Sequence, residues 1–150
     1  KNVPVGLGEP VFNKLHSQLD HGKISREAKV NGRQPIHIHP DDARKRGIGD
    51  KNFVEVFNDR GSCFAVAKID GKLREGVVKM STGSWYDPVD TREEKSPCKN
   101  GNPNVLTPDK GTSKLGQGPI AHSCLVEIRK INKRLDPVTA YNPPVIVRSL

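Results

Sequence analysis

Residues 52–69, NFVEVFNDRGSCFAVAKI, restrict the fold of this chain more than any other segment. Two runs of alternating apolar and polar residues, the pattern of half-buried strands, flank the four residues Asn58, Asp59, Arg60 and Gly61. Glycine tolerates the positive φ that a tight loop often requires, so the segment predicts a β-hairpin with Gly61 in such a position and Arg60 at its tip.

Further strands are predicted on both sides of this hairpin. PIHIH (35–39) alternates as a strand does, and GVVKMS (76–81) and CLVEIRKI (124–131) add two more. A short helix is predicted over about 40–46, within HPDDARKRG. Pro40 suits the first helical position, His39 occupies the cap, acidic residues follow Pro40, and Gly47 can end the helix.

The composition favours short strands joined by turns. The chain has 150 residues, enough for one domain, and contains 14 glycines and 12 prolines, far more than a helical bundle would carry. We expect a mainly β fold of about six strands, a small barrel or sandwich, with long polar loops over 82–123. The charged run DTREEKSPCKNGN (90–102) is the most disorder-like segment.

The formal net charge of +8 predicts an anionic partner: a nucleic acid, an acidic protein surface or a phosphate-bearing ligand. Aromatic residues make up only 5% of the chain and the basic residues are scattered, which argues against an RNA-binding sheet that stacks bases. A free-standing basic barrel that binds nucleic acid or an acidic protein is therefore the alternative hypothesis rather than the favoured one.

Several other kinds of site find little support. The three cysteines include no CxxC pair; buried free thiols are expected, with one long-range disulfide as the alternative. His37 and His39 have a spacing that zinc can use, but no nearby carboxylate or cysteine completes a set of ligands, so no metal site is expected. No run is apolar enough for a membrane span. The start at Lys1 suggests a processed chain or a piece of a longer one, and residues 1–10 are assigned to a linker or to non-native residues.

The segment 101–123, GNPNVLTPDKGTSKLGQGPIAHS, is too long and polar for an ordinary connection, and such loops are usually functional or disordered. It has the glycine, lysine and hydroxyl residues of a phosphate loop without the Walker spacing. Composition alone leaves open a plain surface loop and a loop that presents N–H and hydroxyl groups to an anionic or heterocyclic ligand.

Five ordered motifs resemble one known family. LHSQL (15–19), HPDDARKRGI (39–48), VEVFNDRG (54–61), TGSWYDP (82–88) and the 101–123 segment are similar to the C-terminal domain of bacterial molybdopterin S- and N-oxide reductases. That group includes trimethylamine N-oxide, biotin sulfoxide and dimethyl sulfoxide reductases. The resemblance covers about residues 11–142, and it implies that residues 11–150 form a six-stranded double-psi β-barrel that is one domain of a larger enzyme.

The resemblance also implies a ligand. The domain would hold the pterin guanine dinucleotides of a bis(molybdopterin guanine dinucleotide)molybdenum cofactor, through Lys14, His16, Ser17, Gln18, Asn104, Ala121 and His122. The family usually has Arg where this chain has Lys14, which keeps the charge but loses the planar fork. Trp85, Tyr86 and Lys114 are assigned to packing or loop ordering.

By the same resemblance, the partners are the preceding catalytic domains, which carry the molybdenum ligand and the substrate site. No catalytic or metal-ligating residue is therefore assigned here. The isolated 150 residues are expected to be inactive and to hold no cofactor. The expected location is the periplasm, with the cytoplasm as the alternative.

Overall fold

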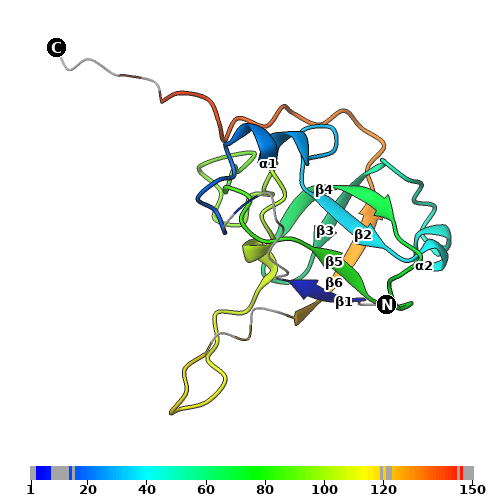
Figure 1. Ribbon diagram of the computed structural model, residues 1–150. Coiled ribbons are helices and arrows are strands. Elements are labelled where there is room, and N and C mark those ends of the chain that lie inside the picture. The colour runs from blue at the N-terminus through cyan, green and yellow to red at the C-terminus, as the bar shows by residue number, and fades with distance from the viewer. Residues whose placement is uncertain are drawn as a thin grey trace.

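A ring of β-strands forms the centre of the molecule in the computed structural model (Figure 1). The structure describes residues 3–7, 14, 16–118, 120, 123–144 and 146. Over these residues the strands are β1 (Val3–Leu7), β2 (Pro35–Ile38), β3 (Phe53–Phe57), β4 (Ser62–Ile69), β5 (Val78–Met80) and β6 (Ser123–Lys130). The described helices are α1 (Lys23–Glu27), α2 (Pro40–Lys45) and the 3-10 helix η1 (Pro103–Leu106). The prediction of a mainly β fold is confirmed.

The strands close into a barrel in the order β1-β5-β2-β4-β3-β6. β1 runs parallel to β5 and β2 runs parallel to β4, whereas the other neighbouring strands are antiparallel. Residues 1–10, assigned from the sequence to a linker or non-native residues, contain strand β1, which pairs with both β5 and β6. Val3–Leu7 therefore contribute to the barrel.

Alternate residues of the strands fill the interior, as the period of two requires. Ile36 and Ile38 of β2, Val54 of β3, and Val78 and Met80 of β5 are all at most 1% exposed. Burying a side chain of this size contributes about 1.5–3 kcal/mol relative to leaving it in water. The alternation of apolar and polar residues that predicted the strands therefore also determines which side chains form the core.

The predicted hairpin is present, with Phe57 opposite Ser62 and the Asn58 N–H donating to the Gly61 carbonyl at 3.0 Å. Gly61 does not adopt a positive φ, which corrects the reason given for it from the sequence. A Cβ at this position would lie 2.8 Å from the Val105 carbonyl oxygen. Gly61 is required because η1 packs directly on the hairpin loop.

The predicted helix is α2, Pro40–Lys45, and it begins as its sequence indicates. The His39 Nδ1 accepts the Asp41 N–H at 3.2 Å, and Gly47 follows the helix with a φ of 64°. The second histidine of the pair, His37, lies with its Nδ1 3.0 Å from a carboxylate oxygen of Asp70. The two imidazoles thus have separate structural partners.

The charged segment 90–102 is not disordered, contrary to its composition. It lies beside the first half of β4, where β2 no longer pairs: the Cys98 N–H donates to the Ser62 carbonyl at 3.0 Å, and the Phe64 N–H donates to the Cys98 carbonyl at 2.9 Å. Ser96, Cys98 and Asn100 are at most 3% exposed. Backbone pairing with an open strand edge orders the segment despite its charges.

The described part of the chain bears on three further expectations. Cys63, Cys98 and Cys124 are free and buried, which confirms the thiol prediction. The helices found among the described residues lack the length and hydropathy of a transmembrane helix. Those residues also contain no group of three or more potential metal-ligating His, Cys, Asp or Glu side chains.

Candidate functional site

A buried carboxylate, Asp20, organises the polar region beside the barrel. Its oxygens accept hydrogen bonds from the Trp85 N–H at 2.9 Å, the Tyr141 hydroxyl at 2.7 Å and the Asn100 amide at 3.2 Å. The ammonium groups of Lys14 and Lys29 each lie 3.2 Å from its Oδ1. Asp20 itself is fully buried. Segments from both ends of the chain therefore meet at one side chain.

The electrostatics of this cluster follow from burial and charge. Burial alone would raise the pKa of Asp20, but the Trp85 amide, Lys29, the Tyr141 hydroxyl and Lys14 outweigh it and lower this pKa to about 2. Burial lowers the pKa of Lys29 to about 8 and also lowers the pKa of Lys14, in both cases against the attraction of Asp20. Two cations thus share one anion, and the cluster carries excess positive charge.

The turn at residues 16–18 packs on this cluster through its backbone. The Trp85 indole N–H donates to the Ser17 carbonyl at 2.7 Å, and the Trp85 ring stacks on His21 with centroids 5.5 Å apart. A Cβ at Gly83 would lie 1.9 Å from the His16 carbonyl oxygen, so only glycine allows this approach. Because the backbone does the anchoring, the side chains of His16, Ser17 and Gln18 remain exposed.

Lys14, unlike these three residues, has a buried side chain. It is 6% exposed, and its ammonium group donates to Gln34 at 2.9 Å and Ser84 at 3.4 Å in addition to Asp20. All three acceptors are side chains of this chain, and they belong to the region that supports the turn. The described structure thus assigns Lys14 a part in supporting the turn, and a contact with an external ligand stays a prediction.

Asn104 lies on η1, which the hairpin loop holds in place. The Leu106 carbonyl accepts from Arg60 Nε at 2.8 Å and from Asn58 Nδ2 at 2.9 Å. Arg60, interpreted from the sequence only as a tip residue, therefore anchors this helix. Pro103 and Leu106 are buried, whereas Asn104 is exposed, with its N–H bonded to Asn102 Oδ1 at 2.9 Å.

The structure brings some of the predicted residues together and not others. Lys14 and the 16–18 turn share the support of Ser84 and Trp85. No hydrogen bond between described residues joins that turn to Asn104. The predicted contacts Ala121 and His122 lie outside the described residues, so their position relative to Asn104 stays a prediction.

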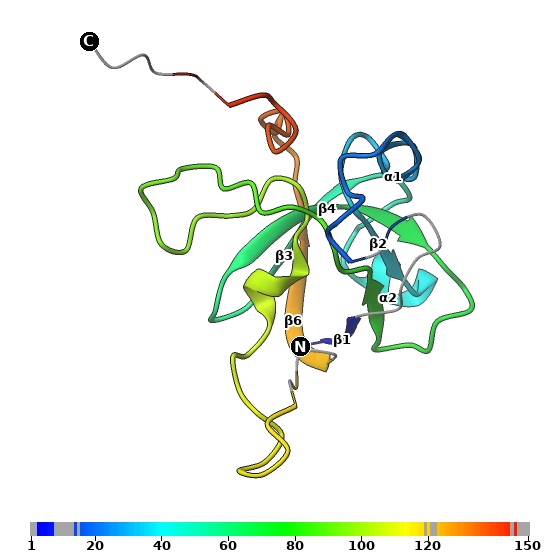
Figure 2. The ribbon, with the colours of Figure 1, turned by 60° about the vertical axis from the view of Figure 1, so that its left-hand side comes forward.

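Beyond η1 the chain forms a loop that extends away from the barrel (Figures 1 and 2). Its described hydrogen bonds are local: the Thr112 N–H donates to the Gly118 carbonyl at 2.8 Å, and the Gly116 N–H donates to Ser113 Oγ at 2.8 Å. Leu115 is 97% exposed. This loop therefore exposes backbone N–H and carbonyl groups, hydroxyl groups and one large apolar side chain.

Sequence reasoning missed the members of the buried cluster. Asp20, Lys29, Asn100 and Tyr141 come from four distant places, and no local motif marks them. The one available signal was TGSWYDP, whose Trp85 and Tyr86 were assigned to packing or loop ordering. Trp85 donates hydrogen bonds to Ser17 and Asp20, so it joins the turn to the cluster.

Comparison with known proteins gives a consistent result. The family described as "Molydopterin dinucleotide binding domain" matches residues 10–125. Trimethylamine-N-oxide reductase of Haemophilus influenzae is 41% identical over 146 residues, which is 96% of this chain and 18% of that protein. Biotin sulfoxide reductase of Cereibacter sphaeroides is 45% identical over 115 residues, 77% of this chain and 15% of the relative.

Among solved structures, acetylene hydratase from Pelobacter acetylenicus has a similar fold, with a TM-score of 0.67 at 19% identity. The match covers 86% of this chain and 18% of that protein. The chain thus spans less than a fifth of the length of each of these relatives.

Proposed function

Because this chain belongs to the molydopterin dinucleotide binding domain family, we propose that it holds pterin guanine dinucleotides of a bis(molybdopterin guanine dinucleotide)molybdenum cofactor in a larger oxidoreductase. The reductase would be of the trimethylamine N-oxide or biotin sulfoxide type, as the names of the relatives suggest. When bound, the cofactor supplies the redox chemistry at molybdenum. We further propose that the strand order is that of a double-psi barrel.

The observation that carries the proposal is the 16–18 turn. Its backbone is fixed by the Trp85 indole and by the close approach of Gly83, while its three side chains remain exposed. A pterin edge offers ring nitrogens and exocyclic amino and carbonyl groups, so it needs both donors and acceptors. Imidazole, hydroxyl and amide side chains on a rigid backbone provide both at low entropic cost.

The other predicted contacts have suitable chemistry. The exposed amide of Asn104 can donate and accept at a pterin edge. The projecting loop offers N–H groups and hydroxyls, and the excess positive charge beside the turn favours the diphosphate groups of the cofactor. Ala121, through its backbone, and His122 complete the proposed set. Lys14 would act by holding the turn and by its charge.

The partners proposed for this domain are the other domains of the same longer protein. They would supply the metal ligand and the substrate site, and the isolated chain would be inactive. A periplasmic location is proposed from the family resemblance, and fractionation of cells that produce the full protein tests it. A free-standing barrel that binds nucleic acid is not favoured, since it explains neither the rigid turn nor the family match.

Cofactor retention in the full-length protein tests the proposal. Gln18→Ala and Asn104→Ala should each lower the molybdenum and guanine nucleotide content of the purified protein, with little change in melting temperature because both side chains are exposed. Asn132→Ala is the matched control, since Asn132 is an exposed asparagine after β6 and outside the proposed site. Unchanged content in both site variants contradicts the assignment.

A further inference from the structure

The segment after β6 crosses the surface of the molecule and returns to the neighbourhood of α1 (Figure 1). Residues 131–144 belong to no helix or strand of the described structure, and they lie beyond residues 10–125, which match the family. At one point the Asp136 carbonyl accepts a hydrogen bond from Arg33. Residues 136–142, called the strap, are held by side chains of other segments rather than by strand pairing.

Asp87 is the first anchor of the strap. Its carboxylate accepts the Thr139 N–H at 2.6 Å, the Thr139 hydroxyl at 2.8 Å and the Ala140 N–H at 3.1 Å. The Lys99 ammonium lies 3.3 Å from the same carboxylate and donates to the Thr139 hydroxyl oxygen at 2.9 Å. Asp87 is buried, and hydrogen bonds to a charged acceptor are stronger than those between neutral groups. One carboxylate thus bonds two backbone N–H groups that lie outside any described strand.

Tyr141 is the second anchor. Its hydroxyl donates to Asp20 at 2.7 Å, and its ring centre lies 5.8 Å from that of Trp85. The Trp85 indole in turn donates to the Ser17 carbonyl at 2.7 Å. The strap therefore reaches the 16–18 turn through two side chains, the buried carboxylate and the indole.

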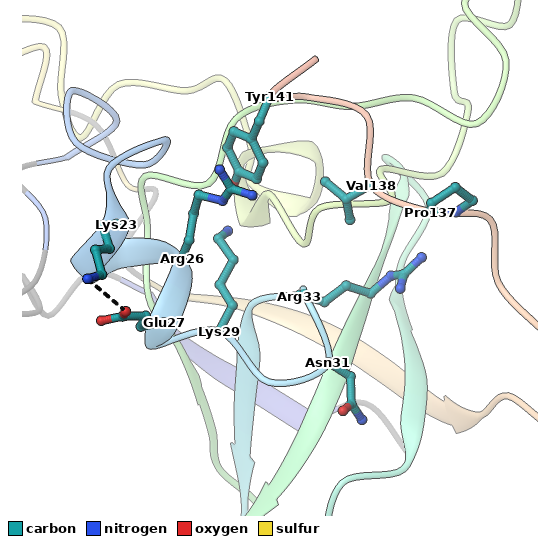
Figure 3. Close-up of a pocket in the computed structure, with 10 residues that line it drawn as sticks. Lys23, Arg26, Glu27, Lys29, Asn31, Arg33, Pro137, Val138 and Tyr141 are labelled. Atoms are coloured by element: carbon teal, nitrogen blue, oxygen red, sulfur yellow. Dashed lines mark ion pairs between the residues drawn. The ribbon is translucent and has the colours of Figure 1, made fainter.

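A hollow of about 670 Å³ separates the strap from α1 (Figure 3). Pro137, Val138 and Tyr141 line it on the strap side. From the other side Arg26 and Lys29 reach toward the Tyr141 ring, with the guanidinium 5.3 Å and the ammonium 5.7 Å from its centre. Because the strap does not pack against α1 along its length, its position depends on its two anchors and on these side chains.

We propose that the strap fixes the conformation of the 16–18 turn, with Asp87 and Tyr141 as positioning residues. Asp87 holds the strap, and the strap places Tyr141 against Asp20 and Trp85, which support the turn. A turn that is ordered before binding loses less conformational entropy when a ligand arrives, so the strap should raise affinity without contacting the ligand. The benefit to cofactor binding rests on the function proposed above, whereas the link between strap and turn does not.

Hydrogen exchange of the 150-residue chain, followed by NMR, tests the link. The reporters are the Trp85 indole N–H and the Asp20 amide N–H, which both donate to the Ser17 carbonyl. Tyr141→Phe removes the hydroxyl at one anchor, and Thr139→Val removes the hydroxyl at the other. Each change should speed exchange at both reporters by at least about fivefold, because the lost hydrogen bond is to a charged group.

Tyr86→Phe and Thr107→Val are the matched controls, since they remove a hydroxyl from the same residue types outside the strap, and exchange should stay within about twofold. Unchanged exchange in both strap variants, or equal acceleration by the controls, would overturn the proposal. Val54→Ala weakens the barrel interior without changing the strap. If it speeds the reporters as much as Thr139→Val does, the turn opens only when the whole barrel unfolds, which also overturns the proposal.

Cofactor retention in the full-length protein tests the benefit to binding. Thr139→Val should lower the guanine nucleotide that remains bound after dialysis by about twofold or more, because the turn is then less ordered before binding. Gln18→Ala separates two failures. A loss with Gln18→Ala but not with Thr139→Val overturns the role of the strap in cofactor binding and leaves the proposed function intact. No loss with either variant contradicts the proposed function and, with it, this role of the strap.

Discussion

The turn at 16–18 and the loop at 107–118 are both polar and exposed, but they are held in opposite ways. Behind the turn lies a fully buried carboxylate with two lysines, an indole N–H and a glycine that admits no side chain. The loop has only local hydrogen bonds in its described part and a leucine that is 97% exposed. The turn is therefore held rigidly by the barrel, whereas the described part of the loop has no such support.

The largest expected effect comes from removing the charge beneath the turn. Asp20→Asn leaves the ammonium groups of Lys14 and Lys29 buried without an anion, and breaking a buried ion pair in this way costs about 3–5 kcal/mol. Urea unfolding of the chain measures it. Asp109→Asn, at an exposed position in the loop, is the control and should change stability by less than about 0.5 kcal/mol. Similar losses of unfolding free energy in both variants would show that the turn is not held more firmly than the loop.

Two glycine substitutions, one in each region, compare how tightly the backbones of the turn and the loop are held. Gly83→Ala should cost roughly 2–3 kcal/mol, because φ is 95° there and the new Cβ would collide with the His16 carbonyl. At Gly111 in the loop the one close approach of a new Cβ, 2.8 Å, is to the Oε1 of the Gln117 side chain, which can move, so Gly111→Ala should cost less than about 0.5 kcal/mol. Thermal unfolding checks both. Equal melting temperatures would mean that the turn is not rigid.

Acid should loosen the turn as Asp20 is protonated. The folded-state pKa of Asp20, about 2, is below its ordinary 3.8, so its stabilisation is full well above pH 3.8 and is lost as the pH falls toward 2. This group alone should lower the free energy of unfolding by roughly 2 kcal/mol between pH 5 and pH 2. The carboxyl carbon signal of Asp20 in NMR gives the midpoint directly, and a midpoint at or above 3.8 contradicts the proposed cluster.

The smallest effect is expected in the loop. Leu115→Ser should change the stability of the isolated chain by less than about 0.5 kcal/mol, because the side chain has almost no packing to lose. In the full-length protein the same change should speed hydrogen exchange of the loop if Leu115 contacts the neighbouring domains. Equal exchange with and without the leucine would show that the loop needs no such contact.

The sequence predicted those strands and helices whose formation depends on residues close together in the chain. The hairpin of β3 and β4, the helix α2 with its His39 cap, and the strands β2, β5 and β6 all follow from periodicity or capping within a few residues. β1 was missed because VPVGL, with a proline and a glycine, has no clear strand pattern. Its pairing depends on partners at 78–80 and 123–126.

The segment 90–102 and the candidate site also depend on contacts between residues that are far apart in the sequence. Charge composition predicted disorder, but Lys99 lies 3.3 Å from Asp87, and Cys98 pairs with the β4 edge. These contacts depend on the fold. The exposed residues of the turn were predicted through the family resemblance, whereas the cluster that supports them joins residues 20, 29, 100 and 141. No sequence window contains such a set.

The place of β6 in the barrel sets the order in which the chain can fold. The hairpin of β3 and β4 needs only neighbouring residues and can form early, within microseconds for a hairpin of this kind. β1, the first of the barrel strands in chain order, must wait for β6, more than a hundred residues later, before both of its edges are paired. Until then the growing chain exposes strand edges that can associate with other chains. Nascent chains that stop before β6 should therefore depend most on chaperones.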